Sequence, residues 1–186
     1  FILVLWLAAF FWLAWYQKTG KGITTNKIML ATVGALILVS MSVSVMTIKS
    51  SNLYFLLSLV LVVSCADIFA FLGGKFFGRH KLMPNVSPGK TWEGLIVGIF
   101  GAMFIGNVLY FVNPVLNLYI WNAVVAITTL AAVVGDLFES MMKRFRKVKN
   151  SGTILPGHGG VLDRLDSLCA AAPVYLCALL HAGYII

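Results

Sequence analysis

Six long apolar runs dominate the sequence and limit what this chain can fold into. They occupy residues 1–16, 28–48, 53–72, 95–112, 115–138 and 168–186. A helix needs about 20 mostly apolar residues to cross the hydrocarbon core of a bilayer. Only 11% of the residues are charged, whereas soluble domains carry about 25%. The runs therefore predict an all-α, polytopic integral membrane protein, with about six transmembrane helices in one domain over residues 1–186.

The connections between these runs carry nearly all of the positive charge. Three of them, residues 17–27, 73–94 and 139–167, hold 13 of the 14 Lys and Arg residues. With six helices these three connections fall on one side of the membrane, and the positive-inside rule makes that side cytoplasmic. Topology thus accounts for the net charge of +8, and no nucleic-acid partner is expected.

The cysteines and the first residues add two smaller expectations. All three cysteines lie in apolar runs, so we interpret them as small buried hydrophobic residues with no disulfide framework. The sequence begins at Phe1 inside an apolar run, without the basic region of a signal peptide. We expect an N-terminally truncated part of a longer protein.

The few acidic residues gather near the predicted cytoplasmic side. Asp67 and Asp136 lie inside apolar runs, near their cytoplasmic ends. Carboxylates within a membrane usually face a bundle interior or an aqueous cavity, and a structural ion pair with a nearby Lys or Arg is the alternative for each. Glu139 follows Asp136 by one helical turn, and Asp163 and Asp166 precede the last run. Such hard oxygen ligands suit Mg²⁺ together with substrate phosphates.

The connection at residues 73–94 contains a phosphate-binding candidate. Its Gly89-Lys90-Thr91 piece resembles the end of a Walker A loop, but the pattern requires glycine where the chain has Pro84. We therefore exclude a P-loop ATPase. Ser87, Lys90 and Thr91 still offer hydroxyl and ammonium donors to phosphates. A solvated basic loop, or one that holds anionic lipid headgroups, is the alternative.

The connection at residues 139–167 is the most distinctive segment, and from Ser140 to Asp166 it reads SMMKRFRKVKNSGTILPGHGGVLDRLD. It combines six Lys and Arg residues with a glycine-rich HGG turn at residues 158–160. Glycines let backbone N–H groups approach phosphate oxygens, although a plain turn between two helices would look similar. The segment has no Cys and His spacing of the kind that binds zinc.

This segment resembles the signature of the phosphatidate cytidylyltransferases, or CDP-diacylglycerol synthases, which runs S-x-x-K-R-x4-K-D-x-G-x3-P-x-H-G-G-x-x-D-R-x-D. The chain matches it at Ser140, Lys143, Arg144, Lys149, Gly152, Pro156, His158, Gly159, Gly160, Asp163, Arg164 and Asp166. It departs at Asn150, where the family has Asp. Upstream, Asp67, GRHKL at 78–82 and SPGKTWEG at 87–94 are similar to bacterial members. The resemblance covers about residues 64–182.

The resemblance implies a reaction in which CTP and phosphatidic acid give CDP-diacylglycerol and pyrophosphate. It implies Mg²⁺ as the cofactor, with a second metal cation as an open alternative. It also implies a bacterial inner membrane protein, in contact with membrane lipids, whose site is on the cytoplasmic side and which forms a homodimer. The connections at 73–94 and 139–167 would form the site.

Residue roles also follow from the resemblance. Asp136 and Asp163 are the preferred metal ligands, and Asp166 and Asp67 are the second candidates. Lys143, Arg144 and Arg164 are expected to neutralise phosphate charge and to complete the catalytic set with Asp136 and Asp163. The substrate-binding set is Ser87, Lys90, Thr91, Lys149, His158, Gly159 and Gly160.

Several other functions compete with this interpretation. An anion or lipid transporter also uses intramembrane acids, but here the acids cluster on one side. A related CTP-dependent membrane enzyme with another lipid phosphate acceptor, or a polyprenol kinase, would carry similar phosphate chemistry. Asn150 raises the possibility of an inactive paralogue, although an amide keeps the shape and acceptor oxygen of Asp, so we expect it to be tolerated. The motif of the CDP-alcohol phosphotransferases is absent.

Overall fold

The computed structural model describes residues 2–20, 26–114, 117–146, 160 and 162–185. Within these residues the chain forms the helices α1 (Ile2–Thr19), α2 (Lys27–Ser51), α3 (Leu53–Phe77), α4 (Trp92–Val112), α5 (Leu118–Phe145) and α6 (Asp166–His181). A short antiparallel hairpin of β1 (Lys81–Met83) and β2 (Ser87–Thr91) connects α3 to α4, and a 3-10 turn, η1 (Leu162–Arg164), precedes α6. The predicted helical class is confirmed, and the hairpin adds a small β element.

Two helices run further than the apolar runs predict. Residues 73–77 continue α3 and residues 139–145 continue α5, although both stretches fall within predicted connections. Hydropathy indicates which residues can lie in lipid, but it does not indicate where a helix ends. A helix can continue past its apolar residues until its backbone is capped or broken. Glu139 and Lys143 therefore lie one turn apart on α5 and form an ion pair there.

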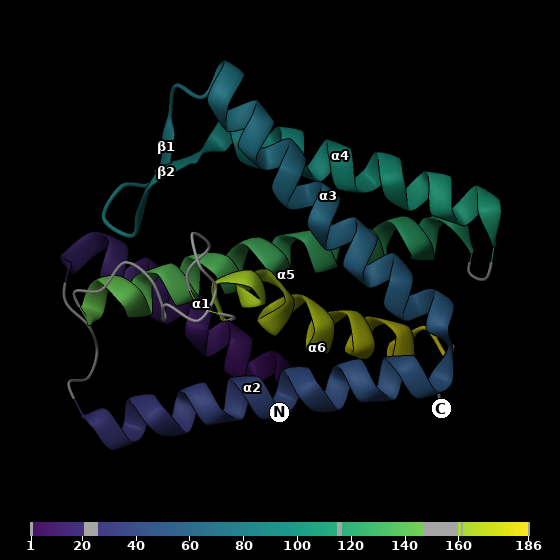
Figure 1. Cartoon of the computed structure of the whole chain (residues 1–186), viewed down its shortest axis with the longest axis horizontal. Helices are drawn as coiled ribbons and strands as arrows, with labels where there is room; N and C mark the ends of the chain where they lie inside the picture. Colours follow the sequence, from purple (N-terminus) through teal and green to yellow (C-terminus); the bar gives the residue numbers. More distant parts are fainter. Residues whose placement is uncertain (1, 21–25, 115–116, 147–159, 161, 186) are drawn as a thin grey trace.

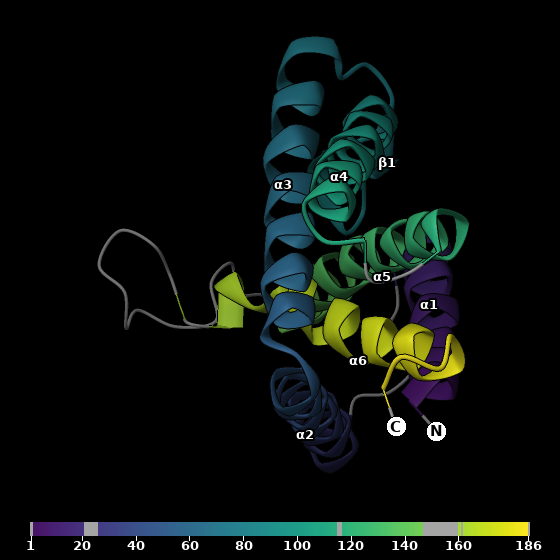
Figure 2. The same cartoon turned by 90° about the vertical axis from the view of Figure 1, so that its right-hand side faces the viewer.

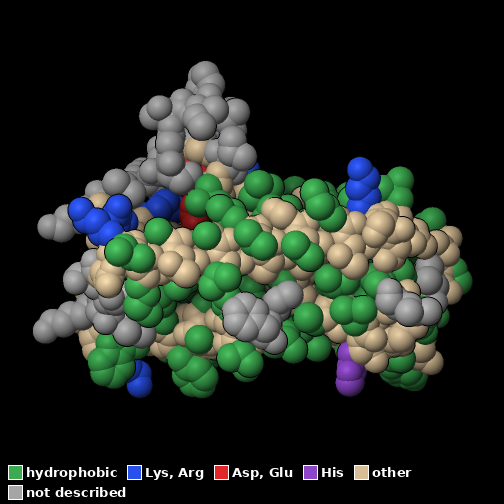
Figure 3. All heavy atoms as spheres, turned by 90° about the horizontal axis from the view of Figure 1, so that it is seen from below, with side chains coloured by type: hydrophobic (Ala, Val, Ile, Leu, Met, Phe, Trp, Pro, Cys, Tyr) green, Lys and Arg blue, Asp and Glu red, His purple; other side chains and the backbone are tan. Residues whose placement is uncertain are grey.

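Four of the helices among the described residues, α2, α3, α4 and α5, are long and apolar enough to cross a membrane. Helix α6 is apolar but shorter, so the count of six spans stays a prediction. Large hydrophobic side chains project outward from the helices; on α4, Phe100 is 71% exposed and Phe111 is 77% exposed. Figure 3 shows such side chains along the length of one face, with most of the charged groups in view toward one end. This surface is that of an integral membrane protein.

Four helices begin at a polar capping residue. Asn26, Asn52 and Asn117 accept hydrogen bonds from the first-turn N–H groups of α2, α3 and α5, and Thr91 does so for α4. Asn and Thr are favoured at this position because their side-chain oxygens satisfy N–H groups that have no partner within the helix. These caps fix where each helix starts at both ends of the bundle.

Helix α6 is the buried centre of the bundle. It packs against α1, α2, α3 and α5, and in Figures 1 and 2 it lies between α2 and α5. Its residues Ala170, Ala171 and Ala172 have no exposed surface. Small side chains let neighbouring helices approach closely, which is how helices associate where lipid supplies no hydrophobic driving force. The polar start of α6 is thereby held among several neighbouring helices.

Helices α3 and α4 pack with their backbones nearly in contact. A Cβ atom on Gly94 would lie 2.7 Å from the carbonyl oxygen of Ala70, and one on Gly98 would lie 2.9 Å from that of Ala66. No side chain fits at these distances. The close approach fixes the start of α4, and with it β2, against the C-terminal half of α3.

Successive helices run in opposite directions, so their polar ends collect on one side. The end of α3, the hairpin, the end of α5 and the start of α6 all lie at the left of Figure 1. The α2–α3 connection, the end of α4 and the start of α5 lie at the right. The three basic connections of the sequence therefore leave the bundle at the same end, as their charge predicts.

Candidate functional site

A cavity of about 570 Å³ lies at this polar end. Its walls come from α3, the hairpin, α4, α5, η1 and α6. The polar and charged lining residues are Asp67, Lys75, Ser87, Lys90, Thr91, Asp136, Asp163, Asp166 and Ser167, and the larger apolar ones are Phe71, Leu82, Leu95 and Val133. Segments that are far apart in sequence therefore contribute to one site.

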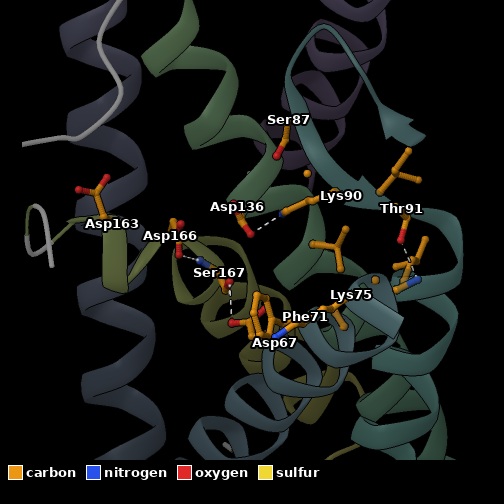
Figure 4. Close-up of a pocket in the computed structure, with 17 residues that line it drawn as sticks. Asp67, Phe71, Lys75, Ser87, Lys90, Thr91, Asp136, Asp163, Asp166 and Ser167 are labelled. Atoms are coloured by element: carbon orange, nitrogen blue, oxygen red, sulfur yellow. Dashed lines mark hydrogen bonds and ion pairs between the residues drawn. The ribbon is translucent and has the colours of Figure 1, made fainter. Parts of the chain in front are cut away.

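Seven of the residues predicted for the site line this cavity together. They are Asp67, Ser87, Lys90, Thr91, Asp136, Asp163 and Asp166, and Figure 4 shows them around it. The structure thus brings together all four aspartates predicted as metal ligands and the hydroxyl and ammonium donors of β2. Their chemical roles stay predictions.

Asp136 and Lys90 form an ion pair across the cavity (Figure 4). The pair joins β2 to α5, and about a quarter of each side chain is exposed. Ser140, one turn further along α5, donates a hydrogen bond to Asp136 Oδ1 at 3.4 Å. The alternative considered from the sequence, an ion pair with a nearby cation, thus occurs here, and the cation is the lysine predicted for phosphate binding.

Asp67 and Asp166 are connected through Ser167. The Ser167 hydroxyl donates to Asp67 Oδ2 at 3.1 Å, and the Ser167 backbone N–H donates to Asp166 Oδ1 at 2.8 Å. Figure 4 shows Ser167 between the two carboxylates. One residue at the start of α6 therefore contacts an aspartate on α3 and the aspartate that begins its own helix.

Lys143 and Gly160 both donate to Asp163 at the edge of the cavity. Lys143 Nζ donates to Asp163 Oδ1 at 2.9 Å, and the Gly160 N–H donates to Asp163 Oδ2 at 2.8 Å. Lys143 also pairs with Glu139, whose side chain is only 12% exposed. The Glu139–Lys143–Asp163 group couples the end of α5 to η1, and it places the predicted catalytic Lys143 beside a predicted metal ligand.

Two predicted phosphate-neutralising arginines lie away from the cavity lining. Arg144 Nε donates to the carbonyl oxygen of Val86 at 3.2 Å, which ties the hairpin turn to α5. Arg164 is exposed on η1. The structure places Gly160 through its bond to Asp163, while Lys149, Asn150, His158 and Gly159 lie outside the described residues.

Thr91 caps helix α4 and also lines the cavity. The residue is 5% exposed, and its Oγ1 accepts a hydrogen bond from the Gly94 N–H at 3.1 Å. This bond caps α4 and engages the oxygen that was predicted to bind phosphate. The hydroxyl proton is the donor that Thr91 has left for a phosphate oxygen.

Sequence reasoning missed three residues that shape the site. Lys75 lies in the last turn of α3 and lines the cavity, but in the sequence it is only one cation of a basic connection. Ser167 follows the DRLD piece directly and lies beyond the family signature. Gly135 precedes Asp136, and a Cβ atom there would lie 2.7 Å from the Asp166 carbonyl oxygen. A small residue next to an intramembrane carboxylate is the signal that marks Gly135.

The cavity carries a net negative charge. Its described lining has four aspartates and two lysines, which gives a formal charge of −2. Carboxylate oxygens are the ligands that Mg²⁺ prefers, so the chemical type of these side chains suits the cation. Within the described part of the chain, however, no three acidic, His or Cys side chains are grouped closely enough to hold a metal ion. Lysine ammonium groups neutralise Asp136 and Asp163 instead.

Comparison with known proteins identifies the family. The profile of the Cytidylyltransferase family matches residues 1–181, so the chain belongs to this family. A phosphatidate cytidylyltransferase of Staphylococcus aureus is 43% identical over 135 residues, which cover 72% of this chain and 52% of that protein. One from Rickettsia bellii is 37% identical over 199 residues, covering 93% of this chain and 81% of that protein.

A third relative, the phosphatidate cytidylyltransferase of Pseudomonas aeruginosa, is 41% identical over 131 residues, which cover 69% of this chain and 48% of that protein. The chain thus spans about half the length of the Staphylococcus and Pseudomonas relatives that it matches.

Proposed function

We propose that this chain carries the active site of a phosphatidate cytidylyltransferase, which transfers the cytidylyl group of CTP to phosphatidic acid. The observation that carries the proposal is the convergence of four aspartates with Ser87, Lys90 and Thr91 in one cavity. The cavity lies at the charged end of an apolar helix bundle. Membership of the cytidylyltransferase family, and relatives that bear this enzyme's name, support the same reaction.

The reaction is a displacement at phosphorus. An oxygen of the phosphatidic acid phosphate attacks the α-phosphorus of CTP, and a new P–O bond forms. The bond from the α-phosphorus to the oxygen that bridges it to the β-phosphorus breaks, and pyrophosphate leaves with the electron pair. Such transfers depend on positioning and on neutralising charge more than on covalent chemistry by the protein.

Charge explains why a divalent cation belongs in the proposal. Both substrates are polyanions, and the described cavity lining is itself negative, so the lining alone would repel them. Mg²⁺ bound by Asp136 and Asp163, with Asp166 and Asp67 as further ligands, would supply the missing positive charge. Lys90 and Lys143 now neutralise two of these aspartates, which keeps both ammonium groups within reach of a phosphate.

The apolar side of the cavity supports a lipid acceptor. Phe71, on α3, lines the cavity and is 67% exposed, and Leu95 on α4 lines it as well. A phosphatidic acid headgroup would meet the polar wall while its acyl chains stay in the bilayer. The proposal places the site on the cytoplasmic side of a bacterial inner membrane, in a homodimer whose mass native mass spectrometry would measure.

The test is product formation by the purified protein in lipid nanodiscs. We expect α-labelled CTP to give a labelled CDP-lipid, with equimolar pyrophosphate, only when phosphatidic acid and Mg²⁺ are both present. Omission of phosphatidic acid and chelation of Mg²⁺ are the controls. A folded sample that binds CTP but labels another lipid phosphate, or labels no lipid, would contradict the proposed acceptor.

A further inference from the structure

Ser167 stands out because it contacts two aspartates that belong to different helices. It is the second residue of α6, and its side chain is buried, with 4% of the residue exposed. Its hydroxyl reaches Asp67 on α3, and its N–H reaches Asp166. The residue before α6, Leu165, gives the helix no side-chain cap. The Asp166 carboxylate instead accepts a hydrogen bond from a first-turn N–H group, that of Ser167.

The bond from Ser167 to Asp67 leaves part of the carboxylate open. It engages Oδ2, and Oδ1 has no hydrogen-bond partner among the residues that the structure describes. An aspartate on a helix otherwise rotates about two side-chain bonds. A donor on a neighbouring buried helix restricts that rotation, and both residues line the cavity.

We propose that Ser167 is a positioning residue that acts through Asp67, and that its hydroxyl sets how tightly the cavity binds a divalent cation. This inference rests on the proposed function, because that function assigns cation binding to the cavity aspartates. Groups that orient a metal-binding carboxylate typically change metal affinity or activity by about 10- to 100-fold when they are removed.

A second serine offers a matched control between the same two helices. Ser58 on α3 has no exposed surface, and its hydroxyl forms a hydrogen bond of 2.8 Å with the Tyr175 hydroxyl on α6. Neither residue lines the cavity. Ser58→Ala therefore removes a buried α3–α6 hydrogen bond, as Ser167→Ala does, but it leaves the aspartates untouched.

The primary experiment measures cation binding without turnover. Mn²⁺ is titrated into the purified protein in nanodiscs, and free Mn²⁺ is followed by electron paramagnetic resonance. We expect Ser167→Ala to weaken Mn²⁺ binding by about 10-fold, Ser58→Ala to stay within about twofold of the unmodified protein, and Ser167→Thr, which keeps the hydroxyl, to restore affinity. Unchanged affinity in Ser167→Ala, or no Mn²⁺ binding by the unmodified protein, would overturn the proposal.

A double-mutant cycle tests whether Ser167 acts through Asp67. If it does, adding Ser167→Ala to Asp67→Asn weakens Mn²⁺ binding no further, because the oriented carboxylate is already gone. Additive losses would overturn the proposal. A Ser167-dependent Mn²⁺ affinity in a protein that makes no CDP-lipid would uphold this inference and reject the proposed reaction, so the two failures are distinguishable.

Discussion

At the scale of single residues, the described site is a set of carboxylates that already have cationic or hydrogen-bonding partners. Lys90 pairs with Asp136, Lys143 pairs with Asp163, and Ser167 donates to Asp67. The sequence predicted the carboxylates and the lysines, because such residues are rare in apolar runs and match a spaced motif. It did not predict which of these side chains pair with each other, since the partners lie on elements that are far apart in the sequence.

Replacement of Asp136 is the sharpest test of the proposed cation site. We expect Asp136→Asn to lower kcat by about 100-fold or more, a loss typical of removing a group that stabilises transition-state charge. The change keeps the size of the side chain, and it also removes the charge that Lys90 neutralises. Single-turnover assays at saturating Mg²⁺ measure the effect, with Mn²⁺ affinity alongside. Near-normal turnover in the folded variant would exclude Asp136 as a ligand.

Lys90 is expected to contribute to nucleotide binding. Lys90→Ala removes an ammonium that now neutralises Asp136 and that we assign to a phosphate. A charge-assisted contact of this kind is worth roughly 1.5–3 kcal/mol, so we expect the KM for CTP to rise about 10-fold or more. Lys49 lies in the last turn of α2, at the end of the bundle opposite the cavity. Lys49→Ala is therefore the control for loss of one positive charge. Equal KM values in the two variants would refute the assignment.

At the scale of elements, the site depends on how closely α5 approaches the start of α6. A Cβ atom on Gly135 would lie 2.7 Å from the Asp166 carbonyl oxygen and 3.0 Å from the Ala170 Cβ atom. Only glycine allows this contact, which holds Asp136 beside the first turn of α6. Helix packing thus sets the distance between two of the aspartates.

Gly135→Ala should therefore damage both folding and activity. The added methyl group must push α5 away from α6, so we expect a lower melting temperature and a loss of turnover of at least about 10-fold, because small misplacements of reacting groups are costly. Gly34→Ala is the matched control, since a Cβ atom there meets nothing within 4 Å. Alanine in an open helix position is favourable by about 0.5–1 kcal/mol. A Gly135→Ala protein as stable and active as the control would contradict the packing argument.

At the scale of the whole molecule, the basic connections leave the bundle at one end, and the last turn of α2, which carries Lys49, lies at the other (Figure 1). From the positive-inside rule we expect the cavity to face the cytoplasm. Exposed hydrophobic side chains along the helices face lipid between the two ends. The orientation of the molecule would therefore decide which compartment supplies the nucleotide of the proposed reaction.

Cysteine labelling tests this orientation. We expect a membrane-impermeant maleimide to label Lys18→Cys and Arg79→Cys in inside-out vesicles, and Lys49→Cys in right-side-out vesicles. The unmodified protein is the control, because its three cysteines lie within α3 and α6, where Cys169 is buried and the other two are half-buried. Labelling of all three positions from the same side would contradict the alternating arrangement of the helices.

The sequence alone determined that this chain is a helical membrane protein with one charged end. Lipid cannot satisfy backbone hydrogen bonds, so long apolar runs must form helices, and positive loops are retained on one side of the membrane. It also predicted the candidate functional segments through a motif of fixed spacing. Only the tertiary structure decided which faces pack and which side chains meet, as at Gly135 and Ser167. Helices that are apolar all round carry no pattern that selects a neighbour, so close backbone contacts and a few buried polar bonds make that choice.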